Sequence, residues 1–359
     1  MSVTPTIAPA AATAEADSVR ARSAASAINQ PLLEIKDLKK YFPVQKGFLK
    51  RTVGYVKAVD GVSLSVNTGE TVGIVGESGS GKTTLGRTLL RLYEPTMGEV
   101  NLRVDGEMVN VTQLNGTDLR KLRRNAQMIF QDPYASLNPR MTVLETVGEP
   151  LFVNGIASGH EMEERVAEII VQVGLRKEHL RRYPHSFSGG QRQRIGIARA
   201  LVVKPRLIVA DEPVSALDVS IQAQILNLLK DLQSQYDLTY LFISHAMNVV
   251  RYMCDRIMVM YAGRMVELAS KSEVMSHPKH PYTEALLSSV PRTSNRIRGE
   301  RTVSAGEVPD LAALPSGCVF HPRCKYAIDR CKTEVPKLRN VDEHLVSCHR
   351  AEELELKGI

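Results

Sequence analysis

The 359-residue sequence lacks any apolar run close to the roughly 18–20 residues that a membrane-spanning helix needs. It also lacks a block of about five or six like charges, so a diffusely basic surface explains the net charge of +7 at least as well as contact with nucleic acid, nucleotides or an anionic membrane. Cysteine is scarce, and five cysteines in this length exclude a secreted disulfide framework. What remains is a globular protein long enough for one large core domain and an appendage.

The first thirty residues lack aromatic side chains and the apolar stretch of a signal peptide. They contain ten alanines, and although their arginines and serines are typical of transit peptides, the composition favours a disordered tail over residues 1–30. We expect order to begin near residue 32. Alternating apolar and polar residues over 56–66 predict a half-buried strand, and the Gly-, Lys- and Arg-containing segment before it is predicted to be a loop.

A phosphate-binding motif follows an apolar run, "TVGIVG", which predicts a buried strand. The motif fits the P-loop pattern of Gly, four residues, then Gly-Lys-Ser/Thr, and comprises Gly76, Glu77, Ser78, Gly79, Ser80, Gly81, Lys82 and Thr83, with Thr84 directly after. A helical pattern comes next, which is the context that the motif requires. Glycines let the backbone wrap around phosphates, and the helix N-terminus presents free N–H groups to them. We expect Lys82 to reach the β- and γ-phosphates of ATP and Thr83 to bind Mg²⁺.

Two further buried strands are predicted, and polar residues stand where each one ends. "RLIVADEP" (206–213) ends in Asp211 and Glu212, and "YLFISH" (240–245) ends in His245. Open α/β sheets present their ligand groups at the carboxyl ends of parallel strands, so these side chains should meet at the P-loop. Asp211 suits Mg²⁺, Glu212 can orient or deprotonate the attacking water, and His245 is predicted to be catalytic rather than structural. The reaction indicated is ATP hydrolysis.

The segment "SFSGGQRQRIGIARAL" (186–201) places a Ser-Gly-Gly-Gln turn before a helix that begins with basic residues. It resembles the signature motif of ABC-type ATPases, with Phe187 in place of the usual leucine. The resemblance implies that the turn contacts the γ-phosphate of ATP held by the P-loop of a second subunit. The residues that this assigns to nucleotide binding are Ser188, Gly189, Gly190 and Gln191. A helix N-terminus built of small residues is also an anion site on physical grounds.

The resemblance to ABC-type ATPases covers about residues 32 to 290. It implies that Gln131 belongs to the catalytic residues and joins the Mg²⁺ site to a transmembrane partner. It further implies that residues 215–218 ("SALD") cross a dimer interface and that His245 is the switch histidine. It also implies that an aromatic side chain stacks on adenine. Phe42 lies at the matching position, with Tyr41 as the second candidate and plain core packing as the alternative. Ala246 departs from the family, which usually has aspartate after the histidine.

Four stretches resemble the dipeptide/oligopeptide importer branch: "FQDPYASLNPR" (130–140), "YPHSFSGGQRQRIGIARAL" (183–201), "ADEPVSALDVSIQAQILNLL" (210–229) and "HPKHPYTEALLSSVPR" (277–292). The resemblance implies an ATPase on the cytoplasmic face of the bacterial inner membrane. Its partners would be two permeases, a second, related ATPase subunit and, indirectly, a substrate-binding protein, with no nucleic acid. Peptides are the expected cargo. Nickel, glutathione, opines and oligosaccharides are alternatives within the branch, and a soluble ABC ATPase acting on nucleic acid is the alternative outside it.

We therefore expect an α/β P-loop NTPase core over residues 31–270, with an N-terminal antiparallel β layer and a helical lobe at about 130–200. Residues 271–359 are expected to form the C-terminal extension of the importer branch. That extension contains four of the five cysteines, and it should be small and compact.

The four clustered cysteines are Cys318, Cys324, Cys331 and Cys348. A reducing compartment makes disulfides improbable, which leaves a metal centre or four unrelated buried thiols. Structural zinc usually uses close Cys-x₂₋₄-Cys pairs, which are absent, and looser spacing suits an iron–sulfur cluster as well or better. The resemblance implies a [4Fe-4S] cluster, with a structural role. Cys254, in a predicted helix after His245, is expected to lie in the core.

Overall fold

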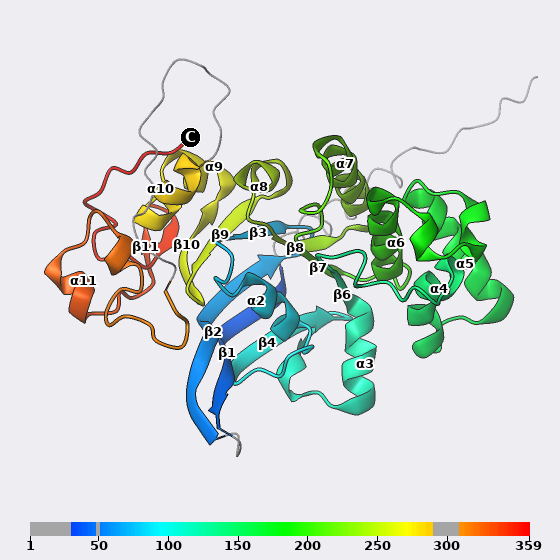
Figure 1. The fold of residues 1–359 in the computed structure, drawn as a ribbon, viewed down its shortest axis with the longest axis horizontal. Helices are drawn as coiled ribbons and strands as arrows, with labels where there is room; N and C mark the ends of the chain where they lie inside the picture. Colours follow the sequence, from blue (N-terminus) through cyan, green and yellow to red (C-terminus); the bar gives the residue numbers. More distant parts are fainter. Residues whose placement is uncertain (1–29, 48–50, 290–308) are drawn as a thin grey trace, which may run out of the picture.

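The computed structural model describes residues 30–47, 51–289 and 309–359, and no helix within these ranges is long and apolar enough to cross a membrane. Two β-sheets organise the molecule, and helices surround them (Figure 1). The predicted disordered tail, except for its last residue, lies outside the described residues. The mixed α/β core with an added antiparallel sheet agrees with the fold expected from the sequence.

The smaller sheet is antiparallel and has the strand order β2-β1-β4-β5. Its strands are β1 (Pro31–Lys46), β2 (Arg51–Asn67), β4 (Met97–Val104) and β5 (Glu107–Asn110). The loop expected between the first two strands is mostly absent, because the β1–β2 ladder continues to the pair Lys46–Arg51. Tyr41, Phe42, Val44, Val53 and Tyr55 have high strand propensity, and pairing across the hairpin extends both strands beyond the alternating region.

The larger sheet has the order β11-β12-β10-β9-β3-β8-β7-β6. Its strands are β3 (Thr71–Val75), β6 (Ala126–Ile129), β7 (Leu207–Asp211), β8 (Thr239–Ile243), β9 (Arg256–Tyr261), β10 (Arg264–Ser270), β11 (Arg339–Val341) and β12 (His344–Val346). Every residue of β3, β7 and β8 is buried, as the continuous apolar runs predict for a covered parallel sheet. These three strands are parallel neighbours, so their carboxyl ends lie at one edge.

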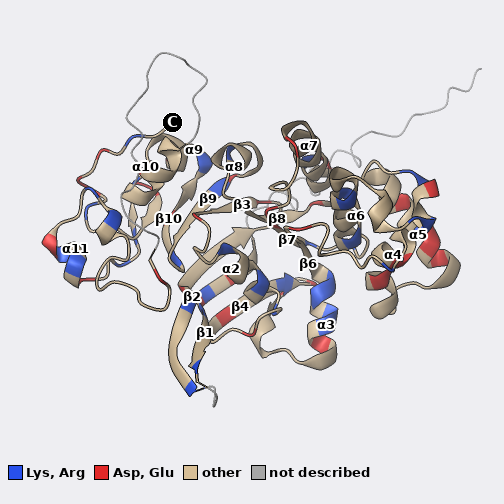
Figure 2. Ribbon diagram, viewed as in Figure 1, with Lys and Arg blue, Asp and Glu red and all other residues tan. Residues whose placement is uncertain are grey.

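The helices are α2 (Lys82–Leu89), α3 (Gly116–Asn125), α4 (Val143–Val153), α5 (Gly159–Gln172), α6 (Gly189–Leu201), α7 (Val219–Tyr236), α8 (Met247–Met253), α9 (Lys271–Ser276), α10 (Pro281–Ser288) and α11 (Asp329–Thr333). Figure 1 shows α4, α5 and α6 gathered at one end of the molecule, where a helical lobe was expected. Their shared core includes Val147, Leu151, Val166 and Ile195. Figure 2 shows acidic residues on α5 and basic ones on α3 and α6, so charge is spread over the surface rather than concentrated.

The C-terminal residues 309–359 do not pack as a separate appendage. Strand β12 pairs with β10 and extends the larger sheet, and Ser347 donates a backbone hydrogen bond to Val266. Cys318, Phe320 and Cys331 belong to the main hydrophobic core. A segment this short buries too little surface to fold alone, and adding a strand to an existing sheet supplies the missing partners.

Candidate nucleotide-binding site

The P-loop connects β3 to α2 and curls so tightly that two positions accept only glycine. A Cβ atom on Gly76 would lie 2.2 Å from the carbonyl oxygen of Met260, and one on Gly81 would lie 2.0 Å from that of Ala58. Gly81 also has φ +101°, a conformation that other residues avoid. The first turn of α2, which includes Thr84, therefore begins at a tightly curled loop, and a helix N-terminus of this kind presents backbone N–H groups to phosphates.

Lys82 is held inside this loop. Its Nζ donates hydrogen bonds to the carbonyl oxygens of Gly76, at 2.8 Å, and Glu77, at 2.9 Å. The residue is only 5% exposed, and burial lowers the pKa of its ammonium group, whereas the charges of Glu212 and Asp211 oppose that change. The buried hydroxyl of Ser80 has no hydrogen-bond partner, while Ser78 and Gly79 are exposed at the tip of the loop. The ammonium group is thus held inside the loop by the loop's own carbonyl groups.

Thr83 and Asp211 meet at the edge of the sheet, as expected for an Mg²⁺ site. The Thr83 hydroxyl donates a hydrogen bond of 2.9 Å to Oδ1 of Asp211, whose Oδ2 is buried without a partner. Burial raises the pKa of this carboxyl group, and the hydrogen bond from Thr83 partly offsets the increase. An ionised carboxylate with an unpaired buried oxygen is unfavourable unless a cation neutralises it. Carboxylate and hydroxyl oxygens are the donors that Mg²⁺ prefers, so these residues fit the ion.

Glu212 lies between Gln131 and His245. Gln131 Nε2 donates a hydrogen bond of 3.1 Å to its Oε2, and His245 Nδ1 lies 3.1 Å from its Oε1. The backbone of Glu212 has φ +45°, a strained value for a residue with a side chain. The structure thus brings together the three residues predicted to be catalytic, and Gln131 contacts the predicted water-activating group rather than Asp211.

The signature residues stand at the exposed N-terminus of α6. Ser188 is the N-cap: its Oγ accepts a hydrogen bond from the backbone N–H of Gln191, and the Gln191 side chain accepts one from the backbone N–H of Ser188. Ser188 is exposed, and Gly189 and Gly190 are partly exposed. No hydrogen bond or ion pair among the described residues joins this turn to the P-loop of the same chain. The first turn of the helix keeps N–H groups free for an anion from outside.

The two aromatic candidates for adenine stacking differ in their contacts. The half-buried ring of Phe42 lies edge-on to Tyr93, at a centroid distance of 5.4 Å, and Lys40 Nζ lies 4.8 Å from its centroid. The Tyr41 hydroxyl donates a hydrogen bond to Asp60, which pairs with Arg264. Tyr41 is therefore committed to a structural network, and adenine stacking by Phe42 stays a prediction.

Sequence reasoning missed two residues, distant in sequence, that form hydrogen bonds with Glu77 of the P-loop. Arg323 forms two hydrogen bonds with the carboxylate of Glu77, and the hydroxyl of Tyr282 accepts one from the Glu77 backbone N–H at 2.7 Å. Arg323 is 246 residues away in sequence, so no local motif links it to the site. The usable signal was Glu77 itself, because a carboxylate inside a phosphate-binding loop needs a counter-charge.

The prediction of an iron–sulfur centre is wrong. The four cysteines are free thiols that line one small cavity of about 10 Å³, far too small for a cluster. Burial raises the pKa values of Cys318, of Cys324 to about 11 and of Cys348 to about 12, so these thiols are neutral in the metal-free protein. Within the described ranges, no three His, Cys, Asp or Glu side chains are placed to hold a metal ion. Cys254 is also buried, in the core.

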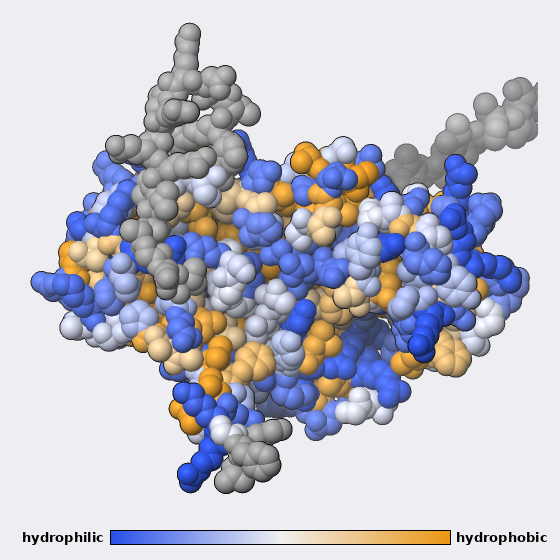
Figure 3. Space-filling view, viewed as in Figure 1, coloured by the Kyte–Doolittle hydropathy of each residue, from blue (hydrophilic) through white to orange (hydrophobic). Residues whose placement is uncertain are grey.

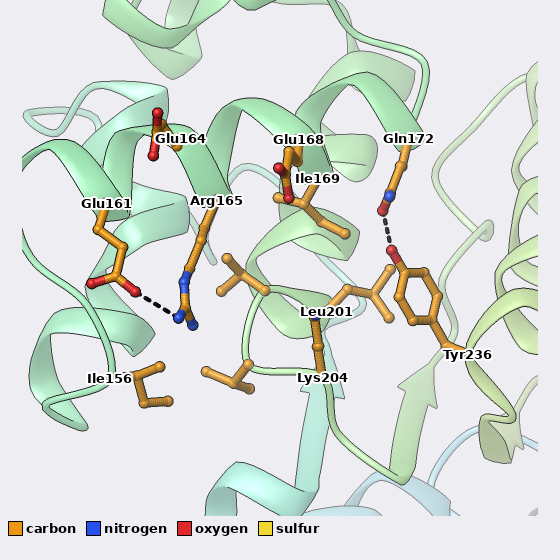
Figure 4. Close-up of a pocket in the computed structure, with 12 residues that line it drawn as sticks. Ile156, Glu161, Glu164, Arg165, Glu168, Ile169, Gln172, Leu201, Lys204 and Tyr236 are labelled. Atoms are coloured by element: carbon orange, nitrogen blue, oxygen red, sulfur yellow. Dashed lines mark hydrogen bonds and ion pairs between the residues drawn. The ribbon is translucent and has the colours of Figure 1, made fainter.

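A larger cavity of about 420 Å³ lies between α5, the end of α6 and the end of α7 (Figure 4). Acidic residues of α5 line it, and Arg165 forms a hydrogen bond with Glu161 inside it. Tyr236 donates a hydrogen bond to Gln172 across its rim. None of the residues predicted to bind nucleotide lines this cavity, so it is separate from the site described above.

The fold and site define an ATP-binding cassette, and comparison with known proteins agrees. Residues 59–215 match the family model of the ABC transporter, and residues 266–331 match that of the oligopeptide/dipeptide transporter C-terminal region. Among solved structures, the dimeric, ADP- and phosphate-bound post-hydrolysis state of the ATP-binding cassette MJ0796 has a TM-score of 0.58 and 32% identity. That match covers 67% of this chain and 98% of the other.

Curated relatives narrow the family further. The oligopeptide transport ATP-binding protein AppF of Bacillus subtilis is 53% identical over 328 residues, covering 90% of this chain and 98% of AppF. The di/tripeptide transport ATP-binding protein DppF of Pseudomonas aeruginosa is 47% identical over 324 residues, covering 90% of this chain and 99% of DppF. The chain belongs to the ATP-binding subunits of peptide ABC importers, which confirms the resemblance found in its sequence.

Proposed function

We propose that this chain hydrolyses ATP at a site shared with a second ATPase subunit and thereby drives import of di- and oligopeptides through two separate permeases. The observation that carries the proposal is the convergence of Lys82, Thr83, Asp211 and Glu212 at the carboxyl ends of β3, β7 and β8. The names of its relatives support a peptide cargo. We assign the ATPase unit to residues 31–270 and the importer-type extension to 271–359.

The residues divide the work of phosphoryl transfer to water. Lys82 and the backbone N–H groups from Gly76 to Thr84 bind the phosphates and offset their charge. Thr83, Asp211 and Gln131 would hold Mg²⁺, which when bound neutralises charge on the phosphate oxygens. Glu212 orients the attacking water or accepts its proton. His245, beside Glu212, holds that carboxylate in place.

A composite site is supported by the exposure of the signature turn. The N-terminus of α6 is accessible at Ser188, Gly189 and Gly190, where it could contact a nucleotide bound by another subunit. Residues 215–218 lead into α7, whose first residue, Val219, is 82% exposed. Figure 3 shows apolar residues gathered over α7, as expected for a surface that a partner covers. The MJ0796 cassette is dimeric, and we propose that the partner here is a related but different ATPase subunit.

We place the chain on the cytoplasmic face of the bacterial inner membrane, docked on its permeases through residues 130–140. In this segment Tyr134 is 60% exposed, under the guanidinium of Arg192 at 4.0 Å. Asp132 Oδ1 accepts hydrogen bonds from the backbone N–H groups of Tyr134 and Ala135, which fixes the loop shape. A rigid loop that presents an aromatic side chain suits the docking of a permease helix. The substrate-binding protein would act only through the permeases.

The test is reconstitution of the chain with its permeases and partner ATPase in vesicles, with labelled dipeptide, nickel or oligosaccharide offered as cargo. ATP-dependent uptake of dipeptide, abolished by Lys82→Ala, is the expected result. Absence of ATP hydrolysis in the assembled complex would contradict the enzymatic proposal. Uptake of a different cargo would retain the enzyme and replace the substrate.

A further inference from the structure

Glu77 is an acidic residue within the loop proposed to bind phosphates, and it directly follows the first glycine of the motif. Its side chain is 30% exposed. A free carboxylate here would repel the phosphates of ATP, since like charges a few ångströms apart in a partly buried site are poorly screened by water. The loop can therefore bind a nucleotide tightly only if this charge is neutralised or turned away.

Arg323 supplies the counter-charge in a bidentate arrangement. Its Nη1 donates a hydrogen bond of 2.8 Å to Oε2 of Glu77, and its Nη2 donates one of 3.0 Å to Oε1. Two parallel hydrogen bonds between a guanidinium and a carboxylate fix direction as well as distance. The Glu77 side chain is thereby drawn toward the C-terminal segment.

The backbone of Glu77 is held as well. Its N–H donates to the hydroxyl of the fully buried Tyr282, and its carbonyl oxygen accepts from Lys82 Nζ. The same carbonyl oxygen also accepts a hydrogen bond from the Ser80 backbone N–H, so five hydrogen bonds determine the orientation of this residue, two of them from Arg323 and one from α10. Lys82, the lysine proposed to bind phosphates, donates a hydrogen bond to the carbonyl oxygen of Glu77. A shift of the Glu77 backbone would therefore also displace the Lys82 ammonium group.

Arg323 is itself fixed by its surroundings. It ends the short turn His321–Arg323 between Cys318 and Cys324, and its side chain is only 9% exposed. Its guanidinium lies 5.7 Å from the ring centroid of Tyr261 and 6.0 Å from that of Phe320, and hydrogen bonding to Glu77 raises its pKa above the usual range. The rings of Tyr261, Tyr282 and Phe320 pack together, with centroids 4.6–5.4 Å apart. A rigid aromatic cluster therefore connects the C-terminal segment to the P-loop.

We propose that Arg323 is a positioning residue for ATP binding, through which the C-terminal segment determines the nucleotide affinity of the P-loop. It neutralises Glu77 and holds the loop in the conformation that accepts phosphates. The inference rests on the proposed role of this loop in binding ATP. A purely structural ion pair, which only attaches the C-terminal segment to the core, makes a different prediction for nucleotide affinity.

The test is a double-mutant cycle in the full chain, with Arg323→Gln, Glu77→Gln and the double variant. The dissociation constant of ATP is measured by fluorescence titration at about 0.05 M and about 0.5 M salt. Arg330→Gln is the matched control, because Arg330 lies in the same segment and pairs with Glu334 on the exposed surface. Thermal unfolding of each protein shows whether it folds, and Arg323→Lys provides a second, milder variant that keeps the charge.

We expect Arg323→Gln to weaken ATP binding roughly tenfold at low salt, in line with the loss of one partner of a partly buried charge pair. The difference in ATP affinity from wild type should be smaller at high salt. The dissociation constant of Arg323→Lys should lie between those of wild type and Arg323→Gln. In the Glu77→Gln background the same change at Arg323 should cost less than about threefold, since no charge remains to neutralise. Arg330→Gln should bind ATP as wild type does.

Two outcomes would overturn the inference. Arg323→Gln that folds and binds ATP as tightly as Arg330→Gln would leave Arg323 with a structural role only. An equal loss of affinity with and without Glu77 would show that neutralising Glu77 is not how Arg323 acts. Failure of the wild-type chain itself to bind ATP would instead contradict the proposed function, so the two failures are distinguishable.

Discussion

Thr83 and Asp211, 128 residues apart in sequence, are joined by a hydrogen bond of 2.9 Å that brings the start of α2 to the end of β7. The bond uses one carboxylate oxygen of Asp211 and leaves the other buried without a partner. The arrangement costs folding free energy without a cation, because a buried carboxylate loses its hydration. Binding of Mg²⁺ would neutralise this carboxylate and so remove the unfavourable free energy of burying its charge.

Asp211→Asn should therefore stabilise the ligand-free protein while abolishing its response to Mg²⁺. Because burial raises the folded-state pKa of Asp211 above the usual 3.8, wild-type stability falls as the pH rises from that value through the raised one. At pH 7 the variant avoids this cost, and its unfolding midpoint should be higher by a few degrees. Thermal unfolding with chelator and with Mg-ATP checks both effects. Asp231→Asn, an exposed change on α7, is the control, and a variant that Mg-ATP still stabilises fully would contradict the assignment.

Glu212→Gln should retain ATP binding and lower turnover by a factor on the order of 10² or more, because an amide cannot accept a proton from water. The contact with Gln131 can persist, so the fold should be unchanged. Phosphate release by the assembled complex and nucleotide titration together separate binding from catalysis. Glu168→Gln on the exposed face of α5 is the matched control, and turnover of Glu212→Gln within a few-fold of wild type would reject the role of Glu212.

Ser188→Arg should impair hydrolysis at the nucleotide held by the partner subunit and leave ATP binding to the P-loop of this chain intact. A bulky cation at the N-terminus of α6 blocks the signature turn and opposes the positive end of the helix dipole. Combined with loss of the P-loop lysine in the partner, it should add little further damage, because both changes affect one composite site. Ser158→Arg, at the exposed N-cap of α5, is the control. Full activity of a dilute monomer would contradict a shared site.

Protein stability should fall at alkaline pH through His344. Burial alone favours its neutral ring, but the hydrogen bond and charge of Glu267, 2.8 Å away, with those of Glu273, raise its pKa above the usual 6.5. The stabilising effect is thus complete below about pH 6.5 and is lost as the pH rises through the raised value, at about 1.4 kcal/mol for each unit of the increase. Urea unfolding at pH 6 and pH 9 should show this loss in wild type and in exposed His277→Gln, but not in His344→Gln. Equal pH dependence in both variants would exclude His344 as the source.

A cysteine at position 135 should form a cross-link to a permease in the assembled transporter. Ala135 is exposed beside Tyr134, and a short bifunctional reagent reaches only residues in direct contact. Glu107→Cys, on the exposed edge strand β5, provides the matched control, since it lies outside the proposed docking segment. An active transporter without the Ala135→Cys cross-link would count against docking through residues 130–140.

Much of the site could be predicted from the sequence because its parts are local. The P-loop needs eight consecutive residues, and the buried strands that end at Asp211 and before His245 are short apolar runs with polar ends. The rule that parallel strands present ligands at their carboxyl ends then brings these residues together. The contact of Gln131 with Glu212 was not predictable in the same way, because it depends on how the segment after β6 turns.

Local sequence therefore determined the strand–loop–helix elements, the chemistry of the phosphate site and the family of the protein. Only tertiary structure decided that β1 and β2 extend into a long hairpin, since cross-strand pairing outweighs the local preference for a loop. It also decided that β12 joins β10, and that the clustered cysteines are free thiols around a cavity too small for a metal cluster. The ion pair between Glu77 and Arg323 was likewise decided by the tertiary structure. Residues this far apart in sequence come into contact only when the whole sheet has formed, and no local pattern encodes such a contact.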